Sequence, residues 1–173
     1  TGKTTISSII SIILSKYFKL NVFKISIDDF YKTREERFLL SKKEHPLLMV
    51  RGVPGTHDIN IILDSFKKLK RKKFTSIKLP RFNKAVDDRY NKKLWYSVKR
   101  RPDVIIFEGW CVGAKAEKNN TLKTPVNSLE KLNDQKLIWR RFVNKQLKSK
   151  YKQLYDQLNC LLFIKSKKFS LLR

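Results

Sequence analysis

The feature that most constrains this chain is its first segment, where a glycine–lysine–threonine motif runs directly into an apolar stretch. Residues 1–5 read Thr-Gly-Lys-Thr-Thr, which matches the end of the phosphate-binding pattern G-x-x-x-x-G-K-[ST]. In this pattern Gly2 lets the backbone approach phosphate oxygens, Lys3 reaches the β and γ phosphates, and the Thr4 hydroxyl can bind Mg²⁺. The apolar residues 6–18 predict a helix whose positive N-terminal end attracts the anion. The motif therefore predicts binding of nucleotide phosphates.

The composition allows one globular domain and argues against membrane insertion. Hydrophobic residues make up 41% of the 173 residues, which is enough for a core. No apolar stretch approaches the ~20 residues needed to span a bilayer. The two cysteines, Cys111 and Cys160, do not suggest a disulfide framework and are typical of a reducing compartment. We expect a cytoplasmic protein without a membrane partner, and the sequence leaves the oligomeric state open.

The formal net charge of +25 is the strongest bulk property, because 40 basic residues face 15 acidic ones. Such a charge favours nucleic-acid binding through phosphate neutralisation. However, the lysines occur along the whole chain, and no zinc-finger spacing or RNA-binding signature accompanies them. The densest run, residues 67–73, suits a helix C-terminus. We therefore favour lysines spread over solvated surfaces, with a non-catalytic or nucleic-acid-associated protein as the alternative.

The order of hydrophobic patterns predicts strands alternating with helices, which is an α/β fold with a parallel sheet flanked by helices. Strands are expected at residues 21–27, 76–79, 103–107 and 161–164. Helices are expected at residues 4–19, 34–43, 59–69 and 132–158. Asp58 is the expected N-cap of the third helix.

Polar residues follow two of the expected strands and, with the phosphate motif, belong to the edge where ligands bind in such sheets. Asp28 and Asp29 follow the first strand, and Glu108 follows the apolar run 103–107. Phosphoryl transfer to an alcohol needs a phosphate cradle, a Mg²⁺ site, a carboxylate that accepts the hydroxyl proton, and balancing cations. Each acid alone is also explained as a helix cap or a surface charge, but their joint placement indicates such a site. We expect Asp28, Glu108 and Lys3 to converge there.

Longer motifs extend over nearly the whole chain. They are SIDDFY at 26–31, TREER at 33–37, HPLL at 45–48, RGVPGTHD at 51–58, LPRFNKAVDDR at 79–89 and FEGWCVGA at 107–114. In this order they resemble the D-glycerate 3-kinase-like P-loop kinases. The wider group includes uridine kinases, pantothenate kinases and phosphoribulokinases, which phosphorylate small-molecule hydroxyls with ATP and Mg²⁺. The resemblance implies a P-loop NTPase-type kinase that uses ATP and Mg²⁺ and acts on a small anionic acceptor, with D-glycerate as the expected one. A related small-molecule kinase with a different acceptor is the alternative within this group.

The resemblance also implies roles for single residues. Asp28 matches the candidate general base, Glu108 matches the acid associated with Mg²⁺, and Lys3 matches the phosphate-loop lysine; these three are the expected catalytic residues. The expected nucleotide-binding residues are Gly2, Lys3, Thr4 and Thr5, and the expected metal ligands are Thr4 and Glu108. The expected acceptor-binding residues are Asp29, Tyr31, Arg51, His57, Asp58, Arg81, Lys84 and Arg89. Arginine forks suit a carboxylate such as that of glycerate.

The chain departs from the pattern of this group at both ends and at one internal position. The first glycine of the phosphate motif and the strand before it are absent, and the chain stops at 169–173, before an expected W-R-x-x-Q-E-like segment. Asn83 stands where Asp is expected. We therefore expect residues 1–173 to be one P-loop kinase domain, incomplete at both ends and lacking its first strand. Because that strand is central in this group, its loss leaves buried backbone groups unpaired at about 1–3 kcal/mol each. We expect the 173 residues alone to be inactive and poorly stable.

Several residues also have simpler interpretations. For His57, packing in a turn is the favoured interpretation over acceptor binding, because a lone histidine is often structural. Cys111 suits loop packing better than a nucleophile's role, because phosphoryl transfer needs no covalent step. Trp110 suits the core or a pocket wall. Arg140 and Arg141 lie where related kinases carry a lid, but a solvated helix face is the favoured interpretation.

Overall fold

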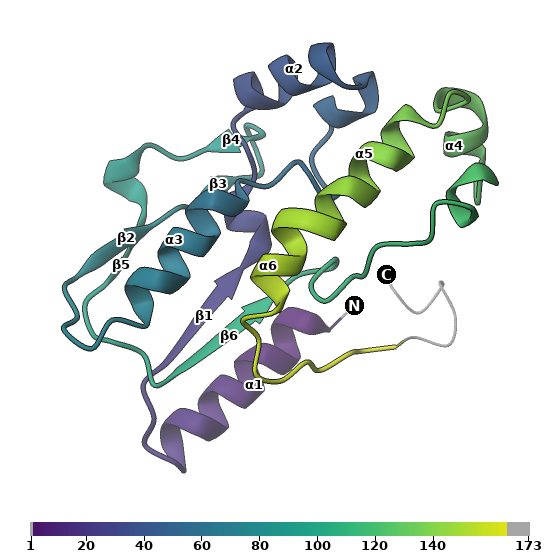
Figure 1. The fold of residues 1–173 in the computed structure, drawn as a ribbon. Helices are drawn as coiled ribbons and strands as arrows, with labels where there is room; N and C mark the ends of the chain where they lie inside the picture. The colour runs from purple at the N-terminus through teal and green to yellow at the C-terminus, as the bar shows by residue number, and fades with distance from the viewer. Residues whose placement is uncertain (1, 166–173) are drawn as a thin grey trace.

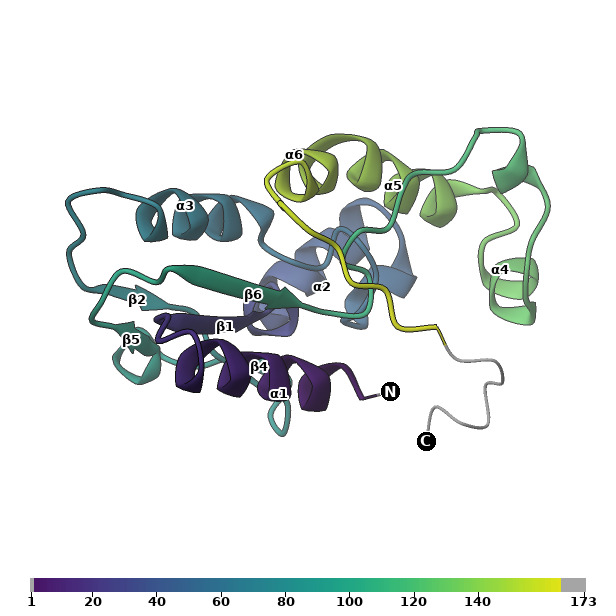
Figure 2. The ribbon, with the colours of Figure 1, turned by 90° about the horizontal axis from the view of Figure 1, so that it is seen from below.

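The structure is a computed structural model that describes residues 2–165, and it places two parallel strands between helices (Figures 1 and 2). The strands are β1 (Val22–Ser26) and β6 (Val104–Glu108). Helix α1 (Lys3–Lys16) lies on one face of the pair and α3 (Ile59–Leu69) on the other, as Figure 2 shows. None of the helices in this part of the chain is both long and apolar enough to cross a membrane. The α/β class and the parallel pairing expected from the sequence are confirmed.

The two parallel strands pair in a register that runs from Val22 opposite Val104 to Ser26 opposite Glu108. Both strands are rich in β-branched and aromatic residues, which suit a pleated surface that is covered on both sides. Among residues 2–165 the parallel sheet consists of these two strands. Because they run in the same direction, both end at one edge, and the residues that follow them share that edge.

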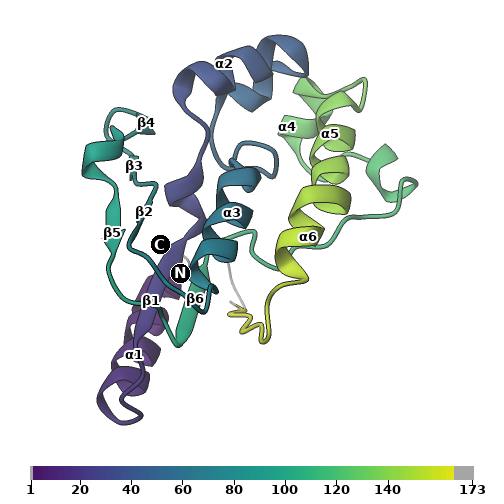
Figure 3. The same ribbon diagram turned by 60° about the vertical axis from the view of Figure 1, so that its left-hand side comes forward.

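Two small antiparallel pairs lie to one side of β1 (Figure 3). Strand β2 (Ile77–Leu79) pairs with β5 (Tyr96–Val98), and β3 (Phe82–Asn83) pairs with β4 (Asp88–Arg89). The strand expected at 76–79 is therefore present as β2, but it joins an antiparallel pair. The other three strands were not expected, because runs of two or three residues are too short to show a period-two pattern.

Helix α2 (Arg34–Lys43) begins with a capping box, which explains why the chain turns helical there. The Thr33 hydroxyl accepts a hydrogen bond from the backbone of Glu36, and the Glu36 carboxylate accepts one from the backbone of Thr33. Inside this helix Arg37 is fully buried. Its guanidinium donates to three backbone carbonyls and pairs with the Asp87 carboxylate at 2.9 Å, which ties α2 to the β3–β4 turn.

The single helix expected at 132–158 is wrong. The chain instead forms α4 (Ser128–Asn133), α5 (Ile138–Gln146), a π-helical segment η5 (Leu147–Tyr151) and α6 (Lys152–Tyr155). The break has a local cause: the Asp134 carboxylate accepts hydrogen bonds from the backbone of Trp139 and Arg140, and so starts a new helix. Leu137 completes the break with a left-handed backbone, φ 63°.

The strand expected at 161–164 is also wrong, since the described chain has no strand there and all four side chains are exposed. An apolar run becomes a strand only where a partner strand satisfies its backbone. The expected helix at 4–19 ends earlier, at Lys16, and Lys19 has a φ of 58° that turns the chain. The end at 169–173 lies outside the described residues, as does Thr1.

Within residues 2–165, four short 3₁₀ turns complete the architecture: η1 (Ile27–Phe30), η2 (Pro46–Met49), η3 (Lys92–Leu94) and η4 (Thr121–Lys123). The first of these directly follows β1 and contributes Ile27 and Phe30 to the core.

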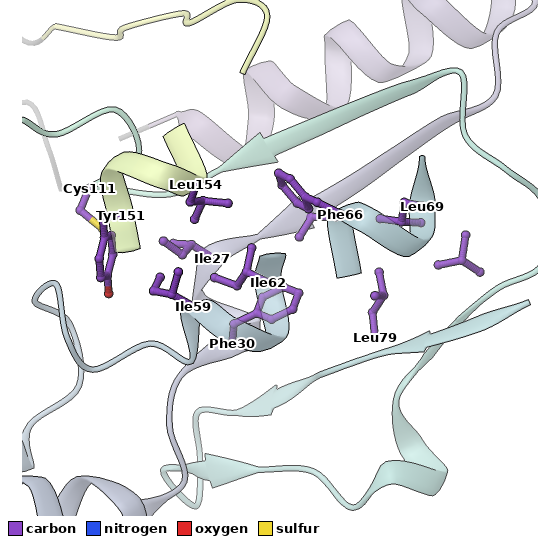
Figure 4. Packing of buried hydrophobic residues seen from close by; sticks show 12 residues of the cluster. Ile27, Phe30, Ile59, Ile62, Phe66, Leu69, Leu79, Cys111, Tyr151 and Leu154 are labelled. Carbon is purple, nitrogen blue, oxygen red and sulfur yellow. The ribbon is translucent and has the colours of Figure 1, made fainter. Parts of the chain in front are cut away.

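The hydrophobic core lies where α3 and α6 pack against η1 (Figure 4). The buried residues of α3 recur at the spacing of one helical face: Ile59, Ile62, Phe66 and Leu69. Leu154 and Tyr151 face them from the C-terminal helices. Phe66 also meets Phe107 of β6 edge to face. This packing fixes β1, and thus the residues that follow it, relative to α3.

We predict that Leu69→Ala lowers the free energy of unfolding of the full-length protein by about 2–5 kcal/mol, because Leu69 is 1% exposed and its loss leaves a cavity. Leu39→Ala is the matched control, since Leu39 is 61% exposed on α2 and should change this free energy by less than about 0.5 kcal/mol. Urea denaturation measures both. Equal losses in the two variants would contradict the described core.

Candidate functional site

The carboxyl edge of the parallel pair gathers polar residues from three segments. Glu108 ends β6 opposite Ser26, and Asp28 follows Ser26 by two residues. The first turn of α1 reaches the same edge, where the Thr4 hydroxyl lies 3.5 Å from a carboxylate oxygen of Glu108 (Figure 1). The phosphate motif and both acids that follow the strands therefore belong to one edge of the sheet.

The start of α1 has the features of an anion-binding turn. Gly2 precedes the helix with a left-handed backbone, φ 71°, a conformation that favours glycine. Lys3, Thr4 and Thr5 form the first turn, in which backbone N–H groups have no partner inside the helix. Those N–H groups and the positive end of the helix suit a phosphate group.

Thr4 and Glu108 offer the kind of donor set that suits Mg²⁺. Mg²⁺ prefers oxygen ligands and is usually held by one or two carboxylates together with substrate phosphates. A hydroxyl and a carboxylate oxygen 3.5 Å apart at the phosphate-binding turn fit that pattern. Within residues 2–165 no cluster of three or more acidic, histidine or cysteine side chains offers an all-protein metal cage.

Asp28 is held by two different partners. The Tyr31 hydroxyl donates to its Oδ1 at 3.2 Å, and the Lys84 ammonium lies 2.8 Å from its Oδ2. Tyr31 is only 4% exposed, and burial raises its pKa, so the hydroxyl keeps its proton and remains a donor. Each of the two carboxylate oxygens of Asp28 therefore has one partner, Tyr31 on Oδ1 and Lys84 on Oδ2.

The second aspartate, Asp29, has a structural position. Its carboxylate accepts a hydrogen bond from the backbone of Phe82, which links η1 to β3. Burial raises the pKa of Asp29. Asp58 caps α3 by accepting from the backbone of Ile61, as expected, and lies 3.8 Å from Arg89. Both acids are thus engaged in contacts that hold the backbone and side chains of the protein in place.

The basic residues expected to bind the acceptor are not gathered on Asp28, apart from Lys84. Arg51 pairs with Asp87. Arg81 lies over the rings of Tyr90 and Tyr96, 4.8 and 5.4 Å from their centroids. Arg89 donates to the Tyr31 carbonyl at 2.8 Å.

His57 lies beneath Tyr31 and is almost fully buried, with 2% exposure. Its ring stacks on Tyr31 with centroids 4.3 Å apart, and its Nδ1 lies 2.7 Å from the Tyr151 hydroxyl. The same hydroxyl also accepts a hydrogen bond from the backbone of Gly55. Burial lowers the pKa of His57 to about 4, so the ring is neutral at physiological pH.

The structure also shows important residues that sequence reasoning missed. Tyr151 lies within the helix expected at 132–158, and nothing in the sequence indicates its hydrogen bonds to His57 and Gly55. Asp87 binds both Arg37 and Arg51. Although burial acts to raise the pKa of Asp87, the hydrogen bonds from these two arginines hold it below its ordinary value. The motif at 79–89 was the available signal for this residue.

The simpler interpretations have mixed outcomes. Arg140 does not lie on a solvated helix face: it is buried and bound to Asp134 at 2.9 Å, whereas Arg141 is exposed. Cys111 is buried and its pKa is raised by burial to about 11, which suits packing. Trp110 is not in the core, because it is exposed at the surface and donates to the Gly52 carbonyl.

The densest basic run lines a groove of about 580 Å³ between α3 and the C-terminal helices. Its lining includes Lys67, Lys70 and Arg71, together with Asp64 and Gln157, and none of the residues at the carboxyl edge. The charge of this groove is thus separate from the site around Asp28.

No family model matches the chain, but individual proteins do. The chain is 34% identical to the chloroplastic D-glycerate 3-kinase of Arabidopsis thaliana over 140 aligned residues. The alignment covers 76% of this chain and 30% of that protein. The chain spans between 30% and 62% of the length of the curated relatives it matches.

Solved structures of kinases share the fold. D-glycerate 3-kinase from Cryptococcus neoformans var. grubii superposes with a TM-score of 0.76 at 27% identity, covering 91% of this chain and 58% of that chain. A structure described as a possible uridine kinase from Bacillus stearothermophilus gives a TM-score of 0.53 at 17% identity, covering 91% and 80%. The second likeness concerns the fold alone.

The buried histidine predicts a defined pH dependence of stability. The pKa of His57 is about 4 in the folded chain against an ordinary 6.5, so only the unfolded chain takes up this proton between these values. The stability that the neutral ring provides is therefore complete above pH 6.5 and falls as the pH drops toward 4. From pH 7 to 4.5 the wild type should lose about 2–3 kcal/mol more than His57→Gln.

Urea denaturation at the two pH values measures this difference, and the variant corrects for the acids that both proteins share. An NMR titration of the His57 ring gives its pKa directly. A ring that titrates near pH 6.5, or equal pH dependence in both proteins, would contradict the burial of a neutral His57.

Proposed function

We propose that the full-length protein is an ATP-dependent kinase that phosphorylates a hydroxyl group of a small anionic acceptor, and we start from the finding that this chain belongs to the P-loop kinase superfamily. The observation that carries the proposal is the shared edge of β1 and β6. At that edge the first turn of α1 brings Thr4 to Glu108 at the end of β6, and Asp28 follows the end of β1. These are the parts that phosphoryl transfer needs.

In this proposal the first turn of α1 binds the phosphates of ATP, and Lys3 balances their charge. Thr4 and Glu108 would hold Mg²⁺, which supplies charge neutralisation between the β and γ phosphates when it is bound. Asp28 accepts the proton of the acceptor hydroxyl while the hydroxyl oxygen attacks the γ-phosphorus. The bond between the γ-phosphorus and the bridging oxygen breaks, and ADP leaves with that oxygen.

The proposed acceptor is D-glycerate. Two of the similar proteins bear the name D-glycerate 3-kinase, and in this chain a cation, Lys84, lies directly beside the proposed base. A hydroxy acid presents its carboxylate a few bonds from its hydroxyl, so one small molecule can reach both side chains. The proposed compartment is the cytoplasm, which the free thiols of Cys111 and Cys160 support.

We predict that Asp28→Asn in the full-length protein lowers kcat by about 10²–10⁴-fold, because an amide cannot take up the hydroxyl proton. The affinity for ATP should change little, since Asp28 lies on the acceptor side. Lys3→Ala should instead weaken ATP binding. Coupled assays of ADP release measure turnover, and calorimetric titration measures ATP affinity. If Asp28→Asn has small effects of similar size on turnover and on stability, Asp28 has a structural role and is not the base.

A substrate panel tests the identity of the acceptor. We expect the full-length protein to phosphorylate D-glycerate in preference to pantothenate, uridine and ribulose 5-phosphate, because the Lys84 ammonium beside Asp28 suits a small carboxylate. Mass spectrometry of the phosphorylated product gives the preference at equal concentrations. A preference for uridine would contradict the proposal of an anionic acceptor, although the protein would still be a kinase.

A further inference from the structure

The two contacts of Asp28 differ in how firmly they are fixed. Tyr31 is buried, stacked on His57 and in edge contact with Phe82, so its hydroxyl has one position. Lys84 follows β3 in an exposed turn, and its side chain is 62% exposed. An exposed ion pair of this kind contributes at most about 1 kcal/mol and exchanges partners readily. Asp28 therefore has one permanent partner and one exchangeable partner.

The other cations nearby are engaged in the framework of the protein. Arg51 is held by Asp87. Arg89 is largely buried and lies between the Tyr31 carbonyl, Glu36 and Asp58. Neither can move to an acceptor without breaking contacts that shape the site. Lys84 can move, because the ion pair with Asp28 is at the surface.

We propose that Lys84 determines specificity for anionic acceptors by exchanging its ion pair, and this inference rests on the proposed kinase function. Before the acceptor binds, Lys84 occupies Oδ2 of Asp28. The acceptor carboxylate then takes the ammonium group of Lys84, and the acceptor hydroxyl takes the vacated position on Oδ2. Tyr31 keeps Oδ1 in place throughout, so the carboxylate of Asp28 stays oriented.

The exchange explains how the site rejects neutral alcohols. A neutral acceptor has no group that can replace Asp28 as the partner of Lys84, so the ion pair competes with its hydroxyl for Oδ2. An anionic acceptor replaces one ion pair with another and leaves Oδ2 free to accept the hydroxyl proton. The proton ends on Asp28, the phosphoryl group on the acceptor oxygen, and ATP becomes ADP, so the step balances.

The test compares D-glycerate with glycerol, which has similar size and hydroxyl groups but no charge. In the full-length protein, Lys84→Gln should lower kcat/KM for glycerate by about 10–100-fold, the size expected for one charge-assisted hydrogen bond. The value for glycerol should stay the same or rise, so the preference for the anion falls. Lys84→Arg should restore most of that preference.

Lys78→Gln is the matched control, because Lys78 is an exposed lysine on neighbouring β2 whose ammonium contacts the Lys93 carbonyl. It should leave the preference unchanged. If Lys84→Gln is active and keeps the full preference for glycerate, the exchange is wrong while the kinase function stands. If the wild type phosphorylates neither acceptor nor any other alcohol of the panel, the kinase function itself fails and the exchange with it.

Discussion

The parallel pairing of β1 with β6 is the constraint on which the candidate site depends. Its register sets Ser26 opposite Glu108, and this alone brings a carboxylate of one strand to the edge where Asp28 follows the other. A slip by one residue would turn every side chain to the opposite face. The core on α3 and the helix α1 hold the pair from its two sides (Figure 2). The position of the proposed base is thus a consequence of hydrophobic packing, in which its neighbours Ile27 and Phe30 take part.

Three neutral ring side chains in contact with one another connect the hydrophobic core to Asp28 and fix the position of its carboxylate. Tyr151 binds His57, His57 stacks on Tyr31, and Tyr31 donates to Asp28. Burial keeps the first three of these groups uncharged, so the proposed base faces a rigid, neutral support on one side. The charge that can respond to a ligand is on the opposite side, in the exposed ammonium of Lys84. In the proposed mechanism, the neutral side chains therefore orient the Asp28 carboxylate, whereas Lys84 recognises the charge of the acceptor.

The net charge of +25 is a poor guide to the role of any single cation. Arg37 and Arg140 are buried and satisfy backbone carbonyls and carboxylates, which makes them part of the framework. A guanidinium suits such positions because it offers several donors in a fixed plane. Many of the lysines lie at the surface, and those of the α3 groove are remote from the carboxyl edge. Location therefore decides function here more than the number of charges.

The sequence by itself determined the α/β class, the kinase relationship, the helices at α2 and α3 and the strands β1 and β6, because these depend on local periodicity, caps and long motifs. It failed at 132–158, where Asp134 starts a second helix, and at 161–164, where no strand offers its backbone. Only the tertiary structure decided which cation contacts Asp28. The sequence offers four cations that could contact Asp28 and does not distinguish between them: Arg51, Arg81, Lys84 and Arg89. In the folded chain, residues distant in sequence bind Arg51 and Arg89, whereas Lys84 lies beside Asp28. Spacing along a chain cannot reveal such choices, since they depend on which residues folding brings within a few ångströms.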